Sequence, residues 1–292
     1  MYKIHNDIFS LCISEKGAEL EEVCVKGINI LWQGNQPWEE KSPILFPIIG
    51  NLKDGFYKYK EQSYFMNTHG FLKKQHFDLV EQKEDSITLK STYSAETLID
   101  YPFKYEFYIT YTLIENRIQI LLKVKNLQQE KMYFSLGLHP GFDYDGLSRL
   151  FAEDFSLFLS PRFVHQVEFN PVFVDKIKKT SLPLSFHLKE LSSLLKDKKT
   201  LCYQGVKQIT LASKTNALSI KHTMPFVAFW QCNPDDPRFL CIEPWMGLPD
   251  KDVTNHQISE KFHIQQLDGR EAFHTNIEIE YLEGAYNGIN SL

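Results

Sequence analysis

The sequence lacks paired cysteines, and this excludes several kinds of site. It holds only 5 cysteines, an odd number, and none of them form a C-x-x-C pair. They are Cys12, Cys24, Cys202, Cys232 and Cys241. The spacing argues against a disulfide framework and against a zinc site of the paired-cysteine kind. It favours reduced, mostly buried thiols, which are typical of a cytoplasmic protein.

The chain also lacks an excess of positive charge and any long apolar run. Its 32 Lys and Arg residues against 37 Asp and Glu give a net charge of −5, so no basic face is expected to neutralise the phosphates of a nucleic acid. No stretch reaches the ~18 apolar residues that a membrane-spanning helix needs. The N-terminal segment MYKIHNDIFSLCISEKG shows no secretion signal. We therefore expect a cytoplasmic location, with no nucleic-acid or membrane partner.

Helical periodicity and the common catalytic signatures are scarce as well. Only LKELSSLLKD, residues 188–197, is expected to supply one or two helical turns. The chain contains no G-x-S-x-G elbow, no phosphate-binding glycine loop and no H-E-x-x-H pair. Combined with the acidic, imidazole and aromatic side chains described below, these absences favour proton transfer on a neutral polar substrate over nucleophilic or metal chemistry.

What the sequence has in abundance is aromatic residues and period-two alternation. Its 22 Phe and 14 Tyr favour strands. Apolar residues alternate over 105–113 and again over 118–124, on either side of a turn at Glu115-Asn116, which predicts a long hairpin. Two more hairpins are predicted within residues 55–66 and 77–94. Further strands are expected at 8–14, 21–25, 131–138, 208–211, 217–221, 226–231, 239–242 and 272–281.

No linker, repeat or change of composition divides the chain. Strands separated by turn signals over this length predict an all-β protein, a large antiparallel β-sandwich. We expect one domain spanning residues 1–292.

Four loops combine turn-forming residues with polar side chains at strand ends, where a rigid sheet can hold them over a cleft. They are LFPIIGNLKDG (45–55), NTHGFLKK (67–74), LGLHPGF (136–142) and FLCIEPWMGLPD (239–250). Each loop alone is also compatible with an ordinary strand followed by a turn.

Three side chains in these loops are candidates for proton transfer. Pro140 biases His139 toward an extended conformation, and Gly70 lets the backbone beside His69 approach its surroundings closely. Glu243 is expected to end an apolar strand, where desolvation raises a carboxyl pKa and suits a general base. The alternative interpretation makes these residues a turn histidine, a loop histidine and a strand-capping glutamate paired with a lysine.

Aromatic residues accompany these candidates. Trp32, Trp38 and Trp245 lie in or near the loops, and Gly137 and Gly141 on either side of the H-P pair would let a ligand approach. Aromatic faces together with convergent polar groups suit a sugar, because its C–H faces stack while its hydroxyls form hydrogen bonds.

Taken in order, the motifs resemble those of a known family. ILWQGNQPWEEKSPILFPIIGNLKDG, HGFLKK, LGLHPGF and IEPWMGLPD are similar to segments of the aldose 1-epimerase (galactose mutarotase-like) family, and most similar to its shorter bacterial branch of LacX-type proteins. The resemblance covers about residues 4–281. It implies a β-supersandwich fold with a sugar bound in a cleft on a broad curved sheet.

The resemblance also implies roles for individual residues. His139 would be the general acid that protonates the ring oxygen, and Glu243 the base that takes the proton of the C1 hydroxyl. His69, Asn51 and Lys73 would bind the sugar, together with Trp245. The substrate would be a free hexose, and neither a cofactor nor a metal would be needed.

The chain departs from the family pattern in its substrate-binding residues. Relatives usually carry arginine where this chain has Asn51, often arginine near Lys73, and an aspartate near the position of Lys199. Two alternatives follow. In the first, the substrate is a hexose 6-phosphate whose phosphate is bound by Lys53, Lys73 and Lys74. In the second, the chain binds carbohydrate without catalysis. Exposed sheet edges leave a monomer or a homodimer open.

Overall fold

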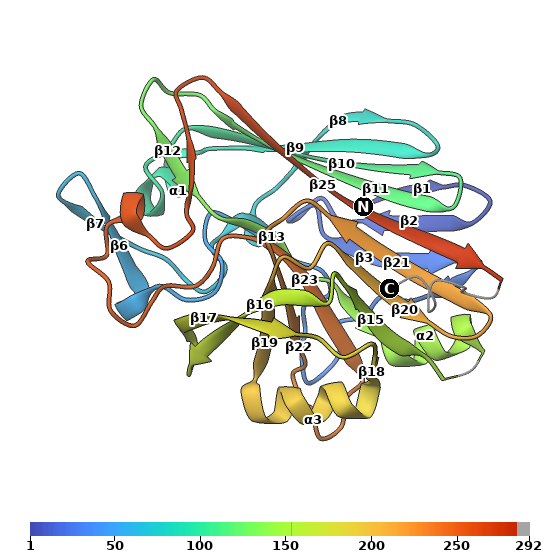
Figure 1. Ribbon diagram of the computed structural model, residues 1–292. Coiled ribbons are helices and arrows are strands. Elements are labelled where there is room, and N and C mark those ends of the chain that lie inside the picture. Colours follow the sequence, from blue (N-terminus) through green and yellow to red (C-terminus); the bar gives the residue numbers. More distant parts are fainter. Residues whose placement is uncertain (153, 285–292) are drawn as a thin grey trace.

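Two large sheets dominate the computed structural model, which describes residues 1–152 and 154–284 (Figure 1). The end of the predicted domain, residues 285–292, lies outside the described residues. The first sheet has nine strands in the described part, in the spatial order β18, β15, β20, β21, β25, β11, β10, β9, β8. Their bounds are Phe186–His187, Ser156–Ser160, Gln208–Ala212, Asn216–His222, Ala272–Glu283, Arg117–Asn126, Tyr105–Ile114, Ser86–Thr92 and Asp78–Gln82.

The second sheet carries Glu243 and Trp245. Its order is β17, β16, β19, β22, β23, β13, β5, and β14 also pairs with β23. The bounds in that order, with β14 last, are Phe173–Ser181, Phe163–Asn170, Thr200–Gln204, Phe226–Trp230, Phe239–Met246, Leu136–Leu138, Ile44–Leu45 and Gly141–Asp143. The pairings around β23 are antiparallel.

Smaller elements complete the fold. A four-stranded sheet contains β1 (Tyr2–His5), β2 (Phe9–Ile13), β3 (Leu20–Val25) and β4 (Ile28–Asn29). Two-stranded pairs join β12 (Met132–Phe134) to β24 (Gln265–Leu267) and β6 (Phe56–Tyr59) to β7 (Gln62–Phe65). The α-helices are α1 (Ala95–Asp100), α2 (Tyr144–Phe151) and α3 (Leu188–Lys198), and the short 3-10 helices are η1 (Lys53–Gly55), η2 (Leu72–Lys74) and η3 (Ile258–Glu260). None of the helices in the described ranges is long and apolar enough to span a membrane.

The predicted all-β, antiparallel sandwich is confirmed. The main core is one apolar cluster that includes Phe107 of the first sheet and Ile242 of the second, so each sheet buries a face against it. Along β23, Leu240 and Ile242 belong to this core, whereas Cys241 and Trp245 belong to separate clusters. Because side chains alternate along a strand, Glu243 is directed to the face opposite the main core.

Three expectations about elements are corrected. Glu243 does not end its strand, because β23 continues to Met246. Residues 131–138 do not form one strand: β12 pairs with β24, and β13 pairs with β23 and β5. Residues 188–197 form most of α3, which is 11 residues long rather than one or two turns. The helices α1 and α2 were not predicted, because at 6 and 8 residues they are shorter than the window over which helical periodicity is recognised.

Candidate active site

The candidate residues gather around one cavity on the outer face of the second sheet. Its volume is ≈ 520 Å³. Five of the six predicted site residues line it, namely Asn51, His69, His139, Glu243 and Trp245. The predicted loops, which are far apart in the sequence, therefore meet at one site.

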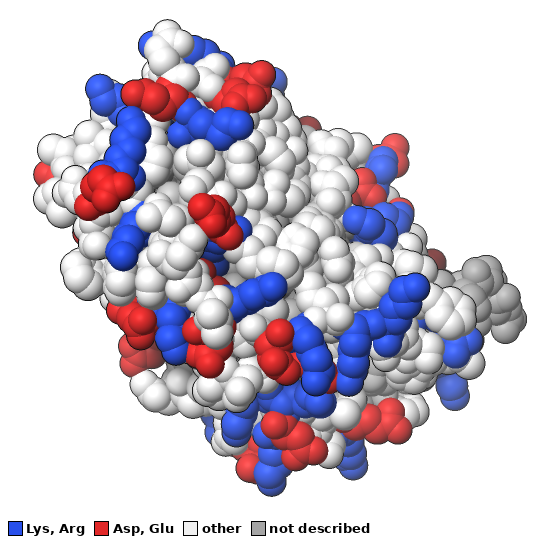
Figure 2. Space-filling model, turned by 60° about the vertical axis from the view of Figure 1, so that its left-hand side comes forward, with Lys and Arg blue, Asp and Glu red and all other residues white. Residues whose placement is uncertain are grey.

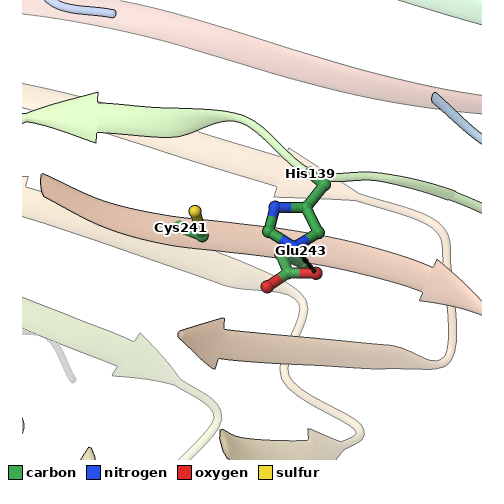
Figure 3. A group of neighbouring side chains, drawn as sticks. All are labelled: His139, Cys241 and Glu243. Atoms are coloured by element: carbon green, nitrogen blue, oxygen red, sulfur yellow. Dashed lines mark ion pairs between the residues drawn. The ribbon is translucent and has the colours of Figure 1, made fainter. Parts of the chain in front are cut away.

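His139 and Glu243 are in direct contact at this site (Figure 3). His139 Nε2 lies 3.2 Å from Glu243 Oε2, and the two side chains are 10% and 2% exposed. Trp245 Nε1 donates a hydrogen bond of 3.2 Å to the same carboxyl oxygen. A buried imidazole and a buried carboxyl at this distance can share a proton.

The strand next to β23 is interrupted between β13 and β14, and His139 lies at this interruption. β13 pairs with Trp245 of β23, and β14 resumes pairing at Cys241. Between these pairings the chain passes through Leu138, His139 and Pro140, which lie opposite Pro244, Glu243 and Ile242 in that order. Pro244 has no N–H to give to a ladder, so a proline is tolerated inside β23 at the point where its neighbour is interrupted. This explains why the strand continues past the E-P pair.

The glycines beside His139 serve packing rather than ligand approach. A Cβ at Gly137 would lie 2.9 Å from a ring atom of Trp245, and one at Gly141 would lie 2.9 Å from a ring atom of Trp38. The two tryptophans can therefore lie close to the H-P segment, and Trp38 stands with its ring centroid 5.1 Å from that of His139.

Burial determines the protonation of the central pair. Desolvation raises the pKa of Glu243 well above its ordinary value, against the hydrogen bond from Trp245, which lowers it. Desolvation lowers the pKa of His139 well below its ordinary value, and the nearby His69 lowers it further. Both shifts favour the uncharged side chains, a protonated carboxyl group beside a neutral imidazole.

His69 is held in a defined tautomer. The backbone N–H of Gly50 donates to His69 Nδ1 at 3.1 Å, which leaves the ring proton on Nε2. Burial lowers the pKa of His69 to about 4, and Lys73 adds to this shift, so the ring is neutral near pH 7. Its ring centroid lies 5.5 Å from that of His139. His69 is thus a neutral hydrogen-bond donor beside the central pair.

The glycine after His69 has the close approach that the motif predicted. Gly70 has φ +75°, and a Cβ there would lie 2.2 Å from the carbonyl oxygen of Phe46. The N–H of His69 donates to Gly50 O at 3.0 Å, and that of Phe71 donates to Phe46 O at 3.0 Å. The HGF and FPIIG loops are therefore joined through their backbones.

Asn51 and Lys73 occupy different positions relative to the cavity. Asn51 lines it, and its Oδ1 accepts a hydrogen bond from Thr68. Lys73 Nζ lies 2.6 Å from Glu40 Oε1. Glu40 lines the cavity whereas Lys73, among the described residues, does not. Lys73 therefore contacts the lining of the cavity through its ion pair with Glu40.

Several lining residues were not among the predicted site residues. They are Trp38, Glu40, Gly50, Thr68, Phe169, Pro171, Val172, Lys199, Thr200, Trp230, Cys232 and Pro249. Trp38 had been noted as an aromatic near a loop, and Lys199 only as a departure from the family pattern. Nothing in the local sequence distinguishes Phe169 or Trp230 from ordinary strand aromatics.

Cys241 lies beside the central pair and raises the question of a metal. Its Sγ and the nearest donor atoms of His139 and Glu243 lie within 4.8 Å of one another (Figure 3). A thiol must lose its proton to bind a metal, but burial raises the pKa of Cys241 well above its ordinary value, and Glu243 raises it further. A metal bound here would be held by the Cys241 thiolate, the His139 imidazole and the Glu243 carboxylate.

Comparisons with known proteins identify the family of this chain. The family model described as aldose 1-epimerase matches residues 1–257. The plasmid-encoded protein LacX of Lactococcus lactis subsp. lactis is 27% identical, covering 91% of this chain and 94% of that protein. A galactose mutarotase related enzyme from Lactobacillus acidophilus is 28% identical with a TM-score of 0.89, covering 98% of both chains.

A second solved structure shares the fold. The galactose mutarotase-like protein from Lactobacillus casei has a TM-score of 0.85 at 24% identity, covering 97% of this chain and 100% of that one. Because the family model matches most of the sequence and the fold agrees over nearly all of it, this chain belongs to the aldose 1-epimerase family.

Proposed function

We propose that this chain interconverts the α and β anomers of a free hexose by general acid–base catalysis. The observation that carries the proposal is the contact of 3.2 Å between His139 Nε2 and Glu243 Oε2 at the cavity. Membership of the aldose 1-epimerase family supports the isomerase class. The cavity of ≈ 520 Å³ lies within the usual range of about 300–1,000 Å³ for small-molecule sites.

The reaction begins by opening the sugar ring. The shared proton moves to His139, so that Glu243 is a carboxylate and His139 an imidazolium. Glu243 takes the proton of the C1 hydroxyl while His139 protonates the ring oxygen, and the bond between C1 and the ring oxygen breaks. The product is the open-chain aldehyde.

Ring closure reverses these transfers after rotation about the C1–C2 bond. His139 takes back the proton of the C5 hydroxyl as its oxygen attacks the other face of the aldehyde, and Glu243 returns a proton to the new C1 hydroxyl. The hemiacetal and the aldehyde have the same oxidation level, so the reaction requires no redox cofactor.

The surrounding residues are suited to hold the sugar. His69 offers an N–H on Nε2, Asn51 offers an amide, and Trp245 and Trp230 present aromatic surface to the cavity. Such faces stack on sugar C–H groups while polar groups bind the hydroxyls. Lys73 acts on the sugar through Glu40 in this proposal, because the two side chains are paired.

The test is anomer exchange on freshly dissolved glucose and galactose, followed by polarimetry or NMR. The wild type is expected to exceed the buffer rate, and His139→Gln and Glu243→Gln are each expected to lose about 10²–10⁴-fold. His76→Gln and Glu84→Gln, at side chains 66% and 79% exposed, are matched controls that keep the rate. A wild-type rate equal to buffer, or one unchanged in both site variants, contradicts the proposal.

The two alternatives have their own outcomes in the same experiment. Faster exchange of glucose 6-phosphate than of glucose would indicate a hexose-6-phosphate epimerase, although two of its candidate lysines are already paired, Lys53 with Asp252 and Lys73 with Glu40, each at 2.6 Å. Sugar binding by calorimetry with no acceleration would indicate a carbohydrate-binding protein without catalysis.

A further inference from the structure

Three donor atoms of different kinds converge where His139 meets Glu243. Cys241 and Glu243 are two residues apart on β23, so their side chains leave the strand on the same face. The His139 ring lies over that face (Figure 3), and the sulfur, a ring nitrogen and a carboxyl oxygen all lie within 4.8 Å of one another. Donor atoms around a tetrahedral zinc ion are roughly 3.5 Å apart, so shifts of about 1 Å would bring these three donors to that geometry.

His139 has a ring nitrogen that nothing in the described part of the chain satisfies. Its Nε2 contacts Glu243, whereas its Nδ1 is buried without a hydrogen-bond partner. Figure 3 shows one ring nitrogen on the side of Cys241 and the other over Glu243. A histidine that binds a metal normally gives its second nitrogen to a carboxylate or a carbonyl. His139, with one unpartnered nitrogen and one carboxyl neighbour, meets this requirement.

The cavity leaves room for a further ligand. His139 and Glu243 line the cavity of ≈ 520 Å³, whereas Cys241 is 0% exposed. A cation that enters from the cavity can therefore bind all three donors and keep a water molecule on its open side. Zinc sites with three protein ligands and one water have this arrangement.

The kinds of donor favour Zn²⁺ over the common hard cations. A thiolate and an imidazole suit zinc, whereas Mg²⁺ and Ca²⁺ take oxygen ligands. The thiolate of Cys241 and the carboxylate of Glu243 together neutralise a divalent cation, so no net charge is buried. Figure 2 shows basic and acidic side chains interspersed over the face it presents, without a dominant patch of one sign. Selection of the cation therefore depends on the buried donors.

Binding of the cation displaces two protons, one from the thiol of Cys241 and one from the carboxyl group of Glu243. Without a metal, burial keeps the proton on Cys241 because it raises the pKa of the thiol. A bound divalent cation is the larger local charge, and a thiol that coordinates it is deprotonated. One cation enters and two protons leave, so the charge of the site is unchanged.

We propose that His139, Cys241 and Glu243 form an inhibitory site for Zn²⁺ at the cavity. The zinc ion occupies the imidazole lone pair and a carboxylate oxygen, which are the groups that transfer protons in the proposed anomer interconversion. The inhibitory effect rests on that proposed function, whereas binding of the ion does not. The reaction itself still needs no metal, and removal of the zinc restores it.

Co²⁺ tests the site without reference to activity, because a thiolate ligand gives this ion a charge-transfer absorption in the near ultraviolet. We expect this band in the reduced wild type, saturating at one Co²⁺ per chain and lost when Zn²⁺ is added. Cys241→Ala and the nearly isosteric Cys241→Ser should both lack it. Two matched controls should keep it: Cys232→Ala, which removes a cysteine that lines the cavity, and Cys202→Ala, which removes another buried one.

Anomer exchange on glucose tests the inhibition, with each protein compared with its own metal-free rate. Zn²⁺ should slow the wild type about 100-fold, as expected for a blocked acid or base, EDTA should restore the rate, and Mg²⁺ should leave it unchanged. Cys241→Ala should need about 100-fold more Zn²⁺ for the same inhibition, since even supporting residues of a metal site contribute about 10–100-fold to affinity.

Two results overturn the zinc site: a wild type without the cobalt band, and a band that persists in both Cys241 variants. Equal sensitivity of the wild type and Cys241→Ala to Zn²⁺ overturns the inhibitory role. A wild type that accelerates no anomer exchange contradicts the proposed function instead, and the cobalt band then decides on the metal site by itself.

Discussion

One carboxyl oxygen, Glu243 Oε2, receives both the contact from His139 and the indole hydrogen bond of Trp245, each at 3.2 Å. The indole N–H stabilises the carboxylate and so lowers the pKa of Glu243. Trp245→Phe keeps an aromatic face but removes this donor. If Glu243 is the base, the acid limb of the kcat/KM profile should move to higher pH by about one to two units, as lost hydrogen bonds to charged groups imply.

A matched substitution separates this effect from general damage. Trp32 also donates its indole N–H, at 2.7 Å, but to the carbonyl oxygen of Trp38 rather than to a carboxyl group. Trp32→Phe should therefore leave the acid limb in place. An acid limb that stays unmoved in Trp245→Phe contradicts the assignment of Glu243 as the titrating base.

His222 makes folding stability depend on pH away from the site. It is 6% exposed, and burial lowers its pKa to about 4, with Lys207 adding to the shift. Because the folded pKa lies below the unfolded value of about 6.5, the unfolded chain binds a proton first as the pH falls. The contribution of neutral, buried His222 to the free energy of unfolding is fully present above pH 6.5. It falls by up to about 3 kcal/mol as the pH drops from 6.5 to 4.

The measurement is urea unfolding of the wild type and His222→Leu across this range. The variant lacks the titrating group, so its free energy of unfolding should fall less steeply toward pH 4. Parallel curves for the two proteins would show that burial of His222 has no such consequence.

At the scale of elements, a buried ion pair joins three segments next to the loop that carries Asn51. Lys261, which directly follows η3, donates to Leu248 O at 2.8 Å and to Asp250 Oδ1 at 2.7 Å, and both charged side chains are at most 5% exposed. Asp250 Oδ2 accepts from the N–H of Lys53 at 2.9 Å, and the N–H of Asp250 donates to Asn51 O at 3.1 Å. The pair thus holds the loop after β23 to the loop that carries Asn51.

Removing one partner of this pair should be costly. Lys261→Ala leaves the carboxylate of Asp250 buried without its counter-charge, and the expected loss is about 3–5 kcal/mol of unfolding free energy. Lys26→Ala breaks an ion pair of 2.6 Å at exposed side chains and should change stability little. Denaturant unfolding of both variants makes the comparison, and equal small losses contradict the role given to Lys261.

The elements also differ in how well the sequence predicted them. The hairpin of β10 and β11 was predicted with its turn at Glu115-Asn116, because alternation and turn chemistry are local. The end of β23 was predicted wrongly. From the local sequence alone, Pro244 indicates that the strand stops at Glu243, because proline usually breaks a strand. Its tolerance depends on the interruption between β13 and β14 at His139, which only strand pairing reveals.

For the whole molecule, we propose that the chain folds as one domain, as predicted for residues 1–292. The main core cluster includes residues from Ile4 in β1 to Tyr281 in β25 and draws on both large sheets. Thermal unfolding should then be a single transition whose calorimetric and van't Hoff enthalpies agree. Two separate transitions, or a van't Hoff enthalpy well below the calorimetric one, would contradict one domain.

A cytoplasmic location and the choice between monomer and homodimer stay predictions.

The sequence by itself determined the strand-rich class, the main hairpins, the family and the loops that supply the candidate residues. The strands and hairpins follow from period-two alternation and turn chemistry, which are properties of neighbouring residues. The family follows from the order of the motifs along the chain. The tertiary structure decided that His139 and Glu243 meet, that Lys73 pairs with Glu40, and that Phe169 and Lys199 line the cavity. Contacts of this kind depend on the order in which distant strands pair and on which face each strand buries, and no local pattern encodes either.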